Sequence, residues 1–302
     1  MTPISRRTLL AAGTALCAVP GSVSAAPAKG SKPPLCVFSK HLADVPWTDL
    51  GRVARDLGYE GIDLTVRPKG HVLPENVERD LPKAVEAIDR QGLPVTMITT
   101  GLISPSDPAA RPTLKTAASL KIPLCKLGYY RYDKRSPEAV IAEVTPQVRG
   151  LVRMAAQYGI AAGFHNHSGA YVGADIWDSR AIFEGLSPEN IGYYFDPGHA
   201  TIEGGLGGWQ ISLGLVLPRL KMVSLKDFAW EKKSGKWSAE WCPMGQGMVD
   251  WKSVFTRMAQ SGFSGPLSMH VEYHAESEAK ALGLAAEFTR KLIDQAWAAS
   301  AS

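Results

Sequence analysis

The sequence has few cysteines, and their number excludes a complete set of disulfides. Its 302 residues include four cysteines, of which Cys17 lies in an N-terminal segment that we expect to be removed. The remaining Cys36, Cys125 and Cys242 are an odd set, so they cannot all pair with one another. Cys36 and Cys125 lie in apolar runs, where cysteine usually behaves as a small buried hydrophobic residue. We therefore expect no structural disulfide.

Long apolar runs and an excess of charge are also absent. Beyond the N-terminal segment no stretch approaches the ~20 apolar residues that a membrane-spanning helix needs. The 33 Lys and Arg residues face 29 Asp and Glu, a formal net charge of +4, and no basic run occurs. A chain so close to neutral offers no extended positive surface for nucleic acid or anionic membranes. No Gly-x-Gly-x-x-Gly follows the first strand-like run, which argues against an open dinucleotide-binding sheet.

The N-terminus has the features of an export signal. Arg6 and Arg7 precede a short apolar stretch, and small residues before Ala26 allow cleavage. Twin arginines ahead of a short apolar core are typical of the bacterial twin-arginine (Tat) pathway. We therefore expect residues 1–25 to be a Tat-type signal peptide and the mature protein, 26–302, to be periplasmic or secreted.

From Pro34 onward, short apolar runs alternate with longer segments of helical period. Alternation of this kind gives a parallel sheet covered by helices, and eight such units in one domain are typical of a (β/α)8 (TIM) barrel. A Gly-rich loop is expected after the sixth strand and a long polar loop, 231–247, after the seventh. The expected strands are 35–39, 61–66, 95–100, 124–129, 160–165, 191–196, 222–228 and 267–273. The expected helices are 47–57, 81–91, 109–120, 137–158, 175–186, 209–220, 251–260 and 276–297.

Acidic and imidazole side chains recur at the ends of four expected strands, which contain five of the seven histidines. Side chains two residues apart on a strand share a face, so His165 and His167 should point the same way. The same rule groups Glu272 with its flanking residues His270 and His274. In a TIM barrel all C-terminal strand ends lie on one face, where active sites sit. The four runs are 163–167, 194–199, 223–227 and 269–274.

Two clusters of candidate residues follow from this placement. Asp196, Glu272 and the two histidines of the fifth strand together suit a divalent cation or a general acid/base pair. A single strand-end histidine more often only hydrogen-bonds a loop, but the set favours a functional site. The second cluster contains Asp63, Arg67, His71, Lys126 and Lys226. There a buried Asp63 could pair with Lys126 or Arg67, or the cations could receive a phosphate or carboxylate of a ligand.

The chain resembles the sugar phosphate isomerase/epimerase superfamily, the xylose isomerase-like barrels. Each matching piece is weak alone, but six in the right order are specific for the superfamily, and the resemblance covers the whole mature chain. It implies a (β/α)8 enzyme whose partner is a small-molecule carbohydrate; the oligomeric state is left open, and a homo-oligomer is compatible with it. The pieces are Gly58–Leu64, Phe164–His167, Phe195–His199, Leu225–Asp227, Met244–Trp251 and Val271–Glu272.

The resemblance also implies one divalent ion (Mn, Mg, Co or Zn) held by Glu, Asp, His and Glu from strands five to eight. The two glutamates of that set move a proton on and off the carbon next to a carbonyl. Asp196 and Glu272 match two of the four positions, whereas the other two fall on Gly163 and Ser224. Any bound metal is therefore expected on the two carboxylates and the fifth strand: Asp196, Glu272, His165 and His167.

These residues predict an enzyme that enolises the carbon next to a carbonyl of a sugar derivative, with Glu272 as base and His199 and Lys226 assisting. A lyase or hydrolase acting on a keto-sugar glycoside is the nearest alternative. Gly163 and Ser224 favour a third reading, a non-catalytic periplasmic carbohydrate-binding barrel. The expected substrate-binding residues are Asp63, Arg67, His71, Lys126, Asn166 and His270.

Overall fold

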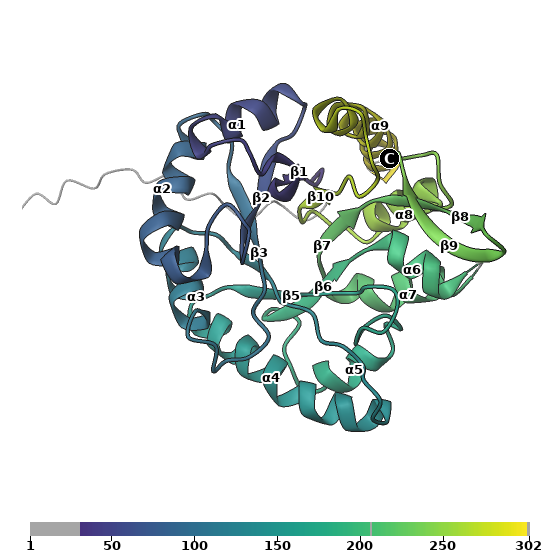
Figure 1. Cartoon of the computed structure of the whole chain (residues 1–302), viewed down its shortest axis with the longest axis horizontal. Coiled ribbons are helices and arrows are strands. Elements are labelled where there is room, and N and C mark those ends of the chain that lie inside the picture. Colours follow the sequence, from purple (N-terminus) through teal and green to yellow (C-terminus); the bar gives the residue numbers. More distant parts are fainter. Residues whose placement is uncertain (1–30, 206, 301–302) are drawn as a thin grey trace, which may run out of the picture.

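The structure is a computed structural model that describes residues 31–205 and 207–300, so the predicted signal peptide lies outside the described residues. Eight parallel strands close into a barrel in the order β1-β10-β7-β6-β5-β4-β3-β2, which confirms the predicted fold (Figure 1). These strands are β1 Leu35–Phe38, β2 Gly61–Val66, β3 Val95–Thr100, β4 Leu124–Lys126, β5 Ala161–His165, β6 Ile191–Phe195, β7 Leu220–Leu225 and β10 Leu267–Met269.

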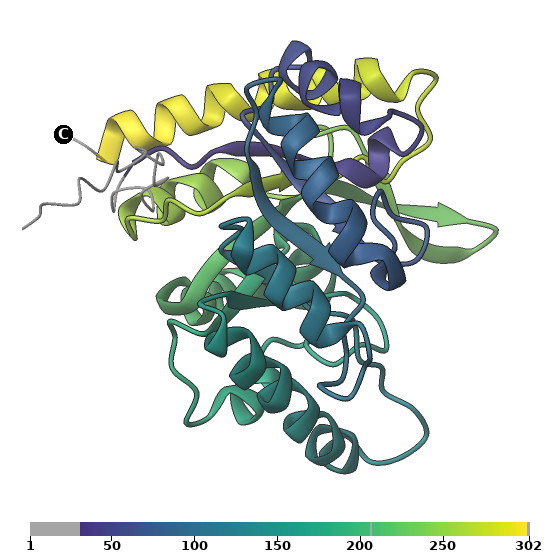
Figure 2. The ribbon, with the colours of Figure 1, turned by 90° about the vertical axis from the view of Figure 1, so that its left-hand side faces the viewer.

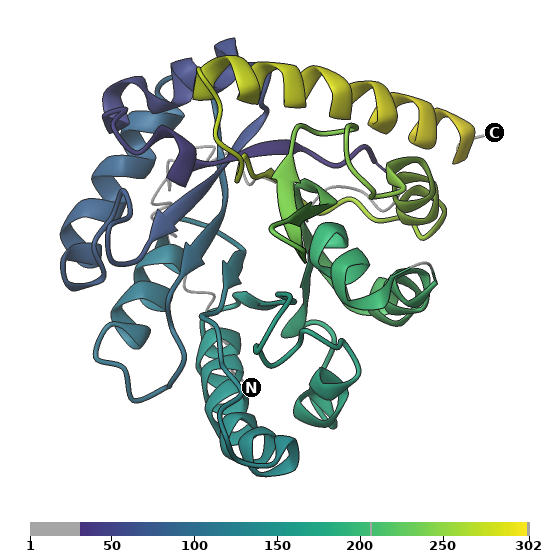
Figure 3. The same cartoon turned by 45° about the vertical axis from the view of Figure 1, so that its right-hand side comes forward.

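Helices surround the barrel and cover the outward face of its strands (Figure 3). They are α1 Trp47–Asp56, α2 Val77–Asp89, α3 Ala110–Ser119, α4 Pro137–Gln157, α5 Asp178–Phe183, α6 Pro197–Gly204, α7 Gly208–Val216, α8 Trp251–Gln260 and α9 Glu278–Ser300. Short 3-10 turns lie at Ser39–Leu42, Pro74–Asn76 and Leu217–Arg219. Within the described residues no helix is long and apolar enough to cross a membrane.

Helix α4 shows how local signals and packing agree. Ser136 caps it by accepting a hydrogen bond from the backbone N–H of Ala139 at 3.3 Å, and Pro137 occupies the first turn. A buried stripe at spacings of three and four residues packs against the barrel: Val140, Val144, Val148, Leu151 and Ala155. The sequence therefore predicts this helix and its buried face correctly.

Two connections differ from the expectation. After β6 the chain enters helix α6 at once, where a Gly-rich loop was expected, because Asp196 acts as N-cap and accepts from the backbone N–H of His199 at 2.9 Å. The expected long loop after β7 is instead an antiparallel hairpin, β8 Asp227–Lys233 and β9 Lys236–Cys242. Its two-residue turn, Ser234 and Gly235, has positive φ at both residues, which suits the twist of a hairpin.

The hairpin marks the end of the barrel at which the site lies. In Figure 2 it projects at the end opposite to the C-terminus of the chain. The Asp227 carboxylate holds its base by accepting four backbone N–H bonds and the Trp251 Nε1–H, at 2.9 to 3.2 Å. The backbone donors belong to Phe228, Gly245, Gly247 and Val249. Cys36, Cys125 and Cys242 are free thiols.

Candidate active site

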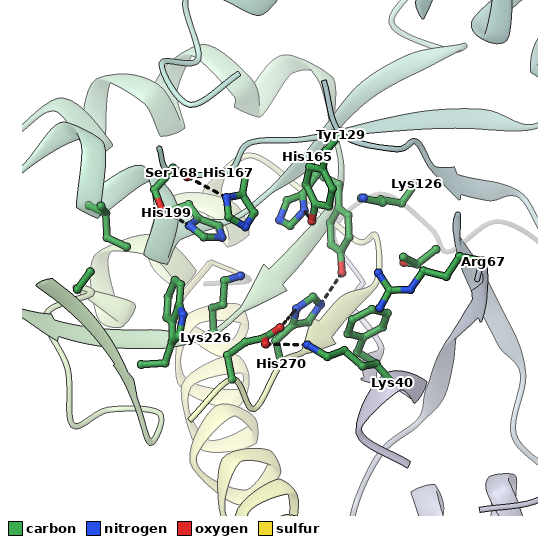
Figure 4. A pocket seen from close by; sticks show the side chains of 17 residues that line it. Lys40, Arg67, Lys126, Tyr129, His165, His167, Ser168, His199, Lys226 and His270 are labelled. Carbon is green, nitrogen blue, oxygen red and sulfur yellow. Dashed lines mark hydrogen bonds and ion pairs between the residues drawn. The ribbon is translucent and has the colours of Figure 1, made fainter. Parts of the chain in front are cut away.

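A polar cavity of about 410 Å³ lies among the C-terminal ends of the strands (Figure 4). Cavities of this size hold small molecules such as sugars. Most of the predicted site residues line it: Arg67, Lys126, His165, His167, His199, Lys226, His270 and Glu272. The parallel barrel therefore brings together residues that are up to 205 positions apart in the sequence. This agrees with the strand-end rule, by which side chains at the C-terminal ends of parallel strands meet on one face of the barrel.

Asp196, just behind the cavity wall, organises one end of the site. It is fully buried, and its Oδ2 accepts from Ser224 Oγ at 2.9 Å and lies 3.2 Å from Lys226 Nζ. His165 Nε2 approaches the same oxygen at 3.4 Å. Burial alone would raise the pKa of Asp196, but Lys226, His199 and His165 together outweigh it and hold the pKa well below its ordinary value. A buried, ionised carboxylate thus fixes Lys226 and His165 in place.

Two imidazoles at this end are neutral, because burial lowers the pKa of His165 to about 3 and that of His199 well below its ordinary value. Both ring nitrogens of His165 have partners: Nε2 donates to Asp196, and Nδ1 accepts from the Tyr129 hydroxyl at 2.6 Å. In His199, Nδ1 lies 2.8 Å from Ser168 Oγ, whereas the buried Nε2 has no hydrogen-bond partner in the described structure. Its charged neighbour is Asp196, whose Oδ2 lies 4.0 Å away, beyond hydrogen-bond distance.

Glu272 reaches the cavity from the chain that follows β10. Its Oε2 accepts from Lys40 Nζ at 2.8 Å, and its Oε1 lies 3.6 Å from His270 Nδ1. Burial alone would raise the pKa of Glu272, but His270, Lys226 and Lys40 together lower it below its ordinary value. The site therefore presents an ionised carboxylate at neutral pH.

Some predicted ligand contacts are instead structural. Asp63 does not pair with Lys126 or Arg67; its oxygens accept from the hydroxyls of three neighbouring residues on β3, β10 and β6, namely Thr99 at 2.7 Å, Ser268 at 2.8 Å and Tyr194 at 3.1 Å. Hydroxyls satisfy the buried carboxyl without a charge, and burial raises the pKa of Asp63 to about 6. Asp63, His71 and Asn166 were all expected to bind substrate, and none of the three lines the cavity.

His71 and Asn166 hold the backbone around the site. His71 Nε2 lies 3.1 Å from the carbonyl oxygen of Leu42. The Asn166 amide donates to the backbone carbonyl of Asp196 at 2.9 Å and accepts from its N–H at 2.7 Å, replacing ladder bonds at the ends of β5 and β6. His274, expected to share a face with Glu272, is exposed because the chain leaves regular strand geometry after Met269.

The residues present do not fit the four-ligand metal site that the family implies. Position 163 carries no side chain, and Met222 fills the space instead, its Cε lying 1.9 Å from where a Cβ would stand, so a side chain there would require Met222 to move. At the His position, Ser224 donates to Asp196 instead of offering an imidazole. The Lys226 ammonium lies 3.2 Å from Oδ2 of Asp196, which matches one of the metal ligands of the family. A cation already neutralises the carboxylate that a metal would need.

The alternative ligand set is not assembled either. Glu272 is engaged by Lys40 and His270, and the His167 ring lies tilted against the His199 ring with centroids 3.9 Å apart. Within the described residues, no three or more His, Cys, Asp and Glu side chains are grouped to hold a metal ion. The expectation that Asp196, Glu272, His165 and His167 form one ligand group is therefore not met.

Several lining residues were missed by the sequence analysis. Lys40 lies in the 3-10 turn just after β1 and directly follows the expected strand 35–39, so its position was a usable signal. Tyr129, Ser168 and Trp241 come from loops and from the hairpin. Trp241 closes one wall edge-on to His199, with ring centroids 5.0 Å apart, and Lys226 Nζ lies 4.6 Å from its ring. Tyr129 is the last residue of the expected strand 124–129, and Trp241 lies in the expected loop 231–247 among tryptophans suited to stacking on a sugar, so Ser168 is the one of the three without a sequence signal.

Fold and cavity together define a (β/α)8 barrel with a polar ligand site at the C-terminal ends of its strands. The model of the xylose isomerase-like TIM barrel family matches residues 52–292, and the chain belongs to this family. A comparison with curated protein sequences gives no significant match.

Solved structures with the same fold include three informative neighbours. A xylose isomerase-like TIM barrel protein from Mycobacterium smegmatis, in complex with magnesium, is 17% identical with a TM-score of 0.70, covering 89% of this chain and 99% of that chain. A D-allulose 3-epimerase from Methylomonas sp. is 14% identical (TM-score 0.66, 86% and 98% covered). A 3-keto-D-glucoside 4-epimerase from E. coli is 16% identical (TM-score 0.66, 86% and 100% covered). At these identities the likeness establishes the fold.

Proposed function

We propose that the protein is a sugar isomerase or epimerase that enolises the carbon next to a carbonyl, with Glu272 as base and the Lys226 ammonium in place of a divalent ion. The observation that carries this proposal is that an ionised carboxylate and an ammonium line one sugar-sized cavity. The fold neighbours support it, because two of them are named as epimerases of a keto sugar and a keto-glucoside.

In the proposed step, Glu272 takes the proton from the carbon next to the carbonyl, and the C–H electron pair forms the C=C bond of an enolate. The carbonyl oxygen gains the negative charge, which the Lys226 ammonium stabilises by a charge-assisted hydrogen bond. The unpartnered Nε2 of His199 is placed to bind a neighbouring hydroxyl. Glu272 returns the proton to the former carbonyl carbon while the proton of the neighbouring hydroxyl passes to the enolate oxygen, which gives the isomer; an epimer requires a second acid to return a proton from the face opposite Glu272.

The test is hydrogen exchange in D2O, followed by ¹H NMR, with D-allulose and a methyl 3-keto-glucoside as probes. Wild-type protein freed of metal by a chelator should incorporate deuterium next to the carbonyl at an unchanged rate. Glu272→Gln keeps the shape of the side chain but cannot accept the proton, so exchange should fall at least ~100-fold. Lys226→Met removes the oxyanion partner and should cost a similar factor.

The matched control is Glu276→Gln, a nearby exposed glutamate that does not line the cavity. Its exchange rate should equal that of the wild type. Exchange that stops on chelation and returns with Mn²⁺ would overturn the metal-free part of the proposal. Tight sugar binding without any exchange would favour a carbohydrate-binding barrel instead.

A lyase acting on a keto-sugar glycoside is the second candidate, because elimination begins with the same proton removal. The β9 residues Ala239 and Trp241 favour it, since they extend the cavity wall onto the hairpin, where a substituent of the sugar could contact the Trp241 ring. Product analysis separates the two reactions: only a lyase releases the aglycone.

A further inference from the structure

The cavity wall carries more cationic groups than its own carboxylates can pair. Four cationic side chains line it, and two of these have a carboxylate partner. Lys40 binds Glu272 at 2.8 Å, and Lys226 lies 3.2 Å from Asp196. Arg67 and Lys126 remain, and neither forms an ion pair with a carboxylate within the described residues. They lie near each other in the cavity, away from His199 (Figure 4).

Lys126 is a buried cation without an anionic partner in contact. It ends β4, is 2% exposed, and its Nζ lies 3.4 Å from the centroid of the Tyr129 ring. The nearest buried acid, Asp63, is occupied by three hydroxyls and makes no ion pair with it. Burial, followed by the repulsion of Arg67, lowers the pKa of Lys126 to about 7. Lys126 is therefore only partly protonated near neutral pH, and an anion that enters the cavity would favour its charged ammonium form.

Arg67 directly follows β2 and faces the same space. Its guanidinium carbon lies 5.3 Å from the centroid of the Phe38 ring. A guanidinium offers a planar pair of N–H donors that match the two oxygens of a carboxylate or a phosphate. Phe38 and Tyr129 add aromatic faces beside the two cations. Both groups line the same cavity, they are near enough for Arg67 to repel a charge on Lys126, and neither forms an ion pair with a carboxylate of the described residues.

We propose that Arg67 and Lys126 form a receptor for an oxyanion of the substrate, so that the enzyme acts on a sugar acid or a sugar phosphate rather than on a neutral sugar. The claim that the anion belongs to the substrate rests on the proposed function, whereas the claim that Arg67 and Lys126 bind an anion does not. An oxyanion at this end leaves the sugar ring between the receptor and the Lys226–His199 end, within reach of Glu272.

Binding of matched probes tests the receptor without turnover. D-glucuronate, D-glucose 6-phosphate and neutral D-glucose share a ring and differ in the anionic group, so calorimetric titrations compare them directly. At least one of the two anions should bind at least ~10-fold tighter than glucose, because charge-assisted bonds to Arg are strong. Raising the salt concentration should weaken the anion but leave glucose unchanged. The stronger anion identifies the substrate class.

Variants assign the effect to the two residues. Arg67→Gln and Lys126→Met should each remove most of the preference for the anion, whereas Lys115→Met, an exposed lysine on α3, should not change it. A melting curve for each variant checks folding. Because Arg67 is only partly buried, we expect Arg67→Gln to fold, and this variant alone can decide the test if Lys126→Met is unstable.

Equal affinities for all three sugars would overturn the receptor, as would a preference that survives Arg67→Gln. These outcomes are separable from a failure of the proposed function. If anions bind through Arg67 but no hydrogen exchange occurs, the receptor stands and the isomerase fails. If a neutral keto sugar exchanges while the anions bind no better than glucose, the isomerase stands and the receptor fails.

Discussion

Met222 and Gly163 form a complementary pair inside the barrel. Met222 is completely buried and extends its methyl group into the space that a side chain on β5 would occupy, 1.9 Å from the ideal Cβ position of Gly163. With Met97 and Tyr194 it forms a small apolar cluster separate from the main core. A flexible thioether is well suited to filling an irregular gap of this kind.

Gly163→Ala should therefore destabilise the protein by about 1–3 kcal/mol through overpacking, and Met222→Ala by about 2–5 kcal/mol through a cavity. The double variant should cost at least ~1 kcal/mol less than the sum, because the second change makes room for the first. Urea unfolding of the four proteins measures this coupling. Additive costs would show that the two side chains do not compete for the same space.

At the residue scale the sequence predicts strand-end side chains well and their partners poorly. His165, Lys226 and Glu272 reach the cavity because parallel strands end on one face, which is a property of the chain order alone. The hydroxyl partners of Asp63 depend instead on the stagger of β2 against β3 and β10 and on the length of Tyr194. Such contacts between distant strands leave no periodic trace in the sequence.

The β8–β9 hairpin depends on one carboxylate at its base. Asp227 accepts five hydrogen bonds, four of them from backbone N–H groups of the hairpin and of the loop before α8. Gly247 fits beside it because a Cβ there would lie 2.2 Å from Asp227 Oδ1. The hairpin in turn carries Trp241, a wall of the cavity.

Asp227→Asn should destabilise the protein by at least ~3 kcal/mol, because an amide NH2 would face backbone donors and leave buried N–H groups without acceptors. Asp250→Asn is the matched control: Asp250 is an exposed N-cap of α8, bound to Ser253, and asparagine caps nearly as well. Urea denaturation compares the two variants. Similar midpoints for both would show that the carboxylate does not hold the hairpin.

At the element scale, the order and type of the barrel elements follow from the sequence, but the hairpin and α6 do not. The polar composition of residues 231–247 suggested a loop, and the pairing of Trp230 with Ala239 becomes visible only once the turn at Ser234 and Gly235 is known. Pro197 and Gly198 suggested a turn, whereas Asp196 caps a helix there. Local composition alone did not reveal either element.

At the scale of the whole molecule, most histidine side chains are buried, and burial favours their neutral form. Burial lowers the pKa of His165 to about 3 and of His270 to about 4, and it also lowers the pKa of four others: His41, His71, His167 and His199. The unfolded chain binds protons at these residues below pH 6.5 while the folded chain does not. Their contribution to stability is therefore complete above pH 6.5 and is lost as the pH falls toward 4.

We expect the free energy of unfolding to decrease by at least ~2 kcal/mol between pH 6.5 and pH 5, since each such imidazole contributes up to about 1.4 kcal/mol per pH unit. Asp63 and Asp178, whose pKa values burial raises to about 6, act in the opposite direction but are fewer. Denaturant unfolding across this range measures the slope. His270→Gln should reduce the slope by about 1.4 kcal/mol per pH unit, and His274→Gln, at an exposed position, should not. A flat profile would contradict the assignment.

The pairing of Met222 with Gly163 also has an evolutionary consequence. A glutamate placed at position 163 alone would force the Met222 methyl group to move, and a histidine at position 224 alone would remove the hydroxyl that binds Asp196. Lys226 would meanwhile repel any incoming cation. Each of these single changes disturbs an existing contact, so an ion site in this barrel interior would need several substitutions made together.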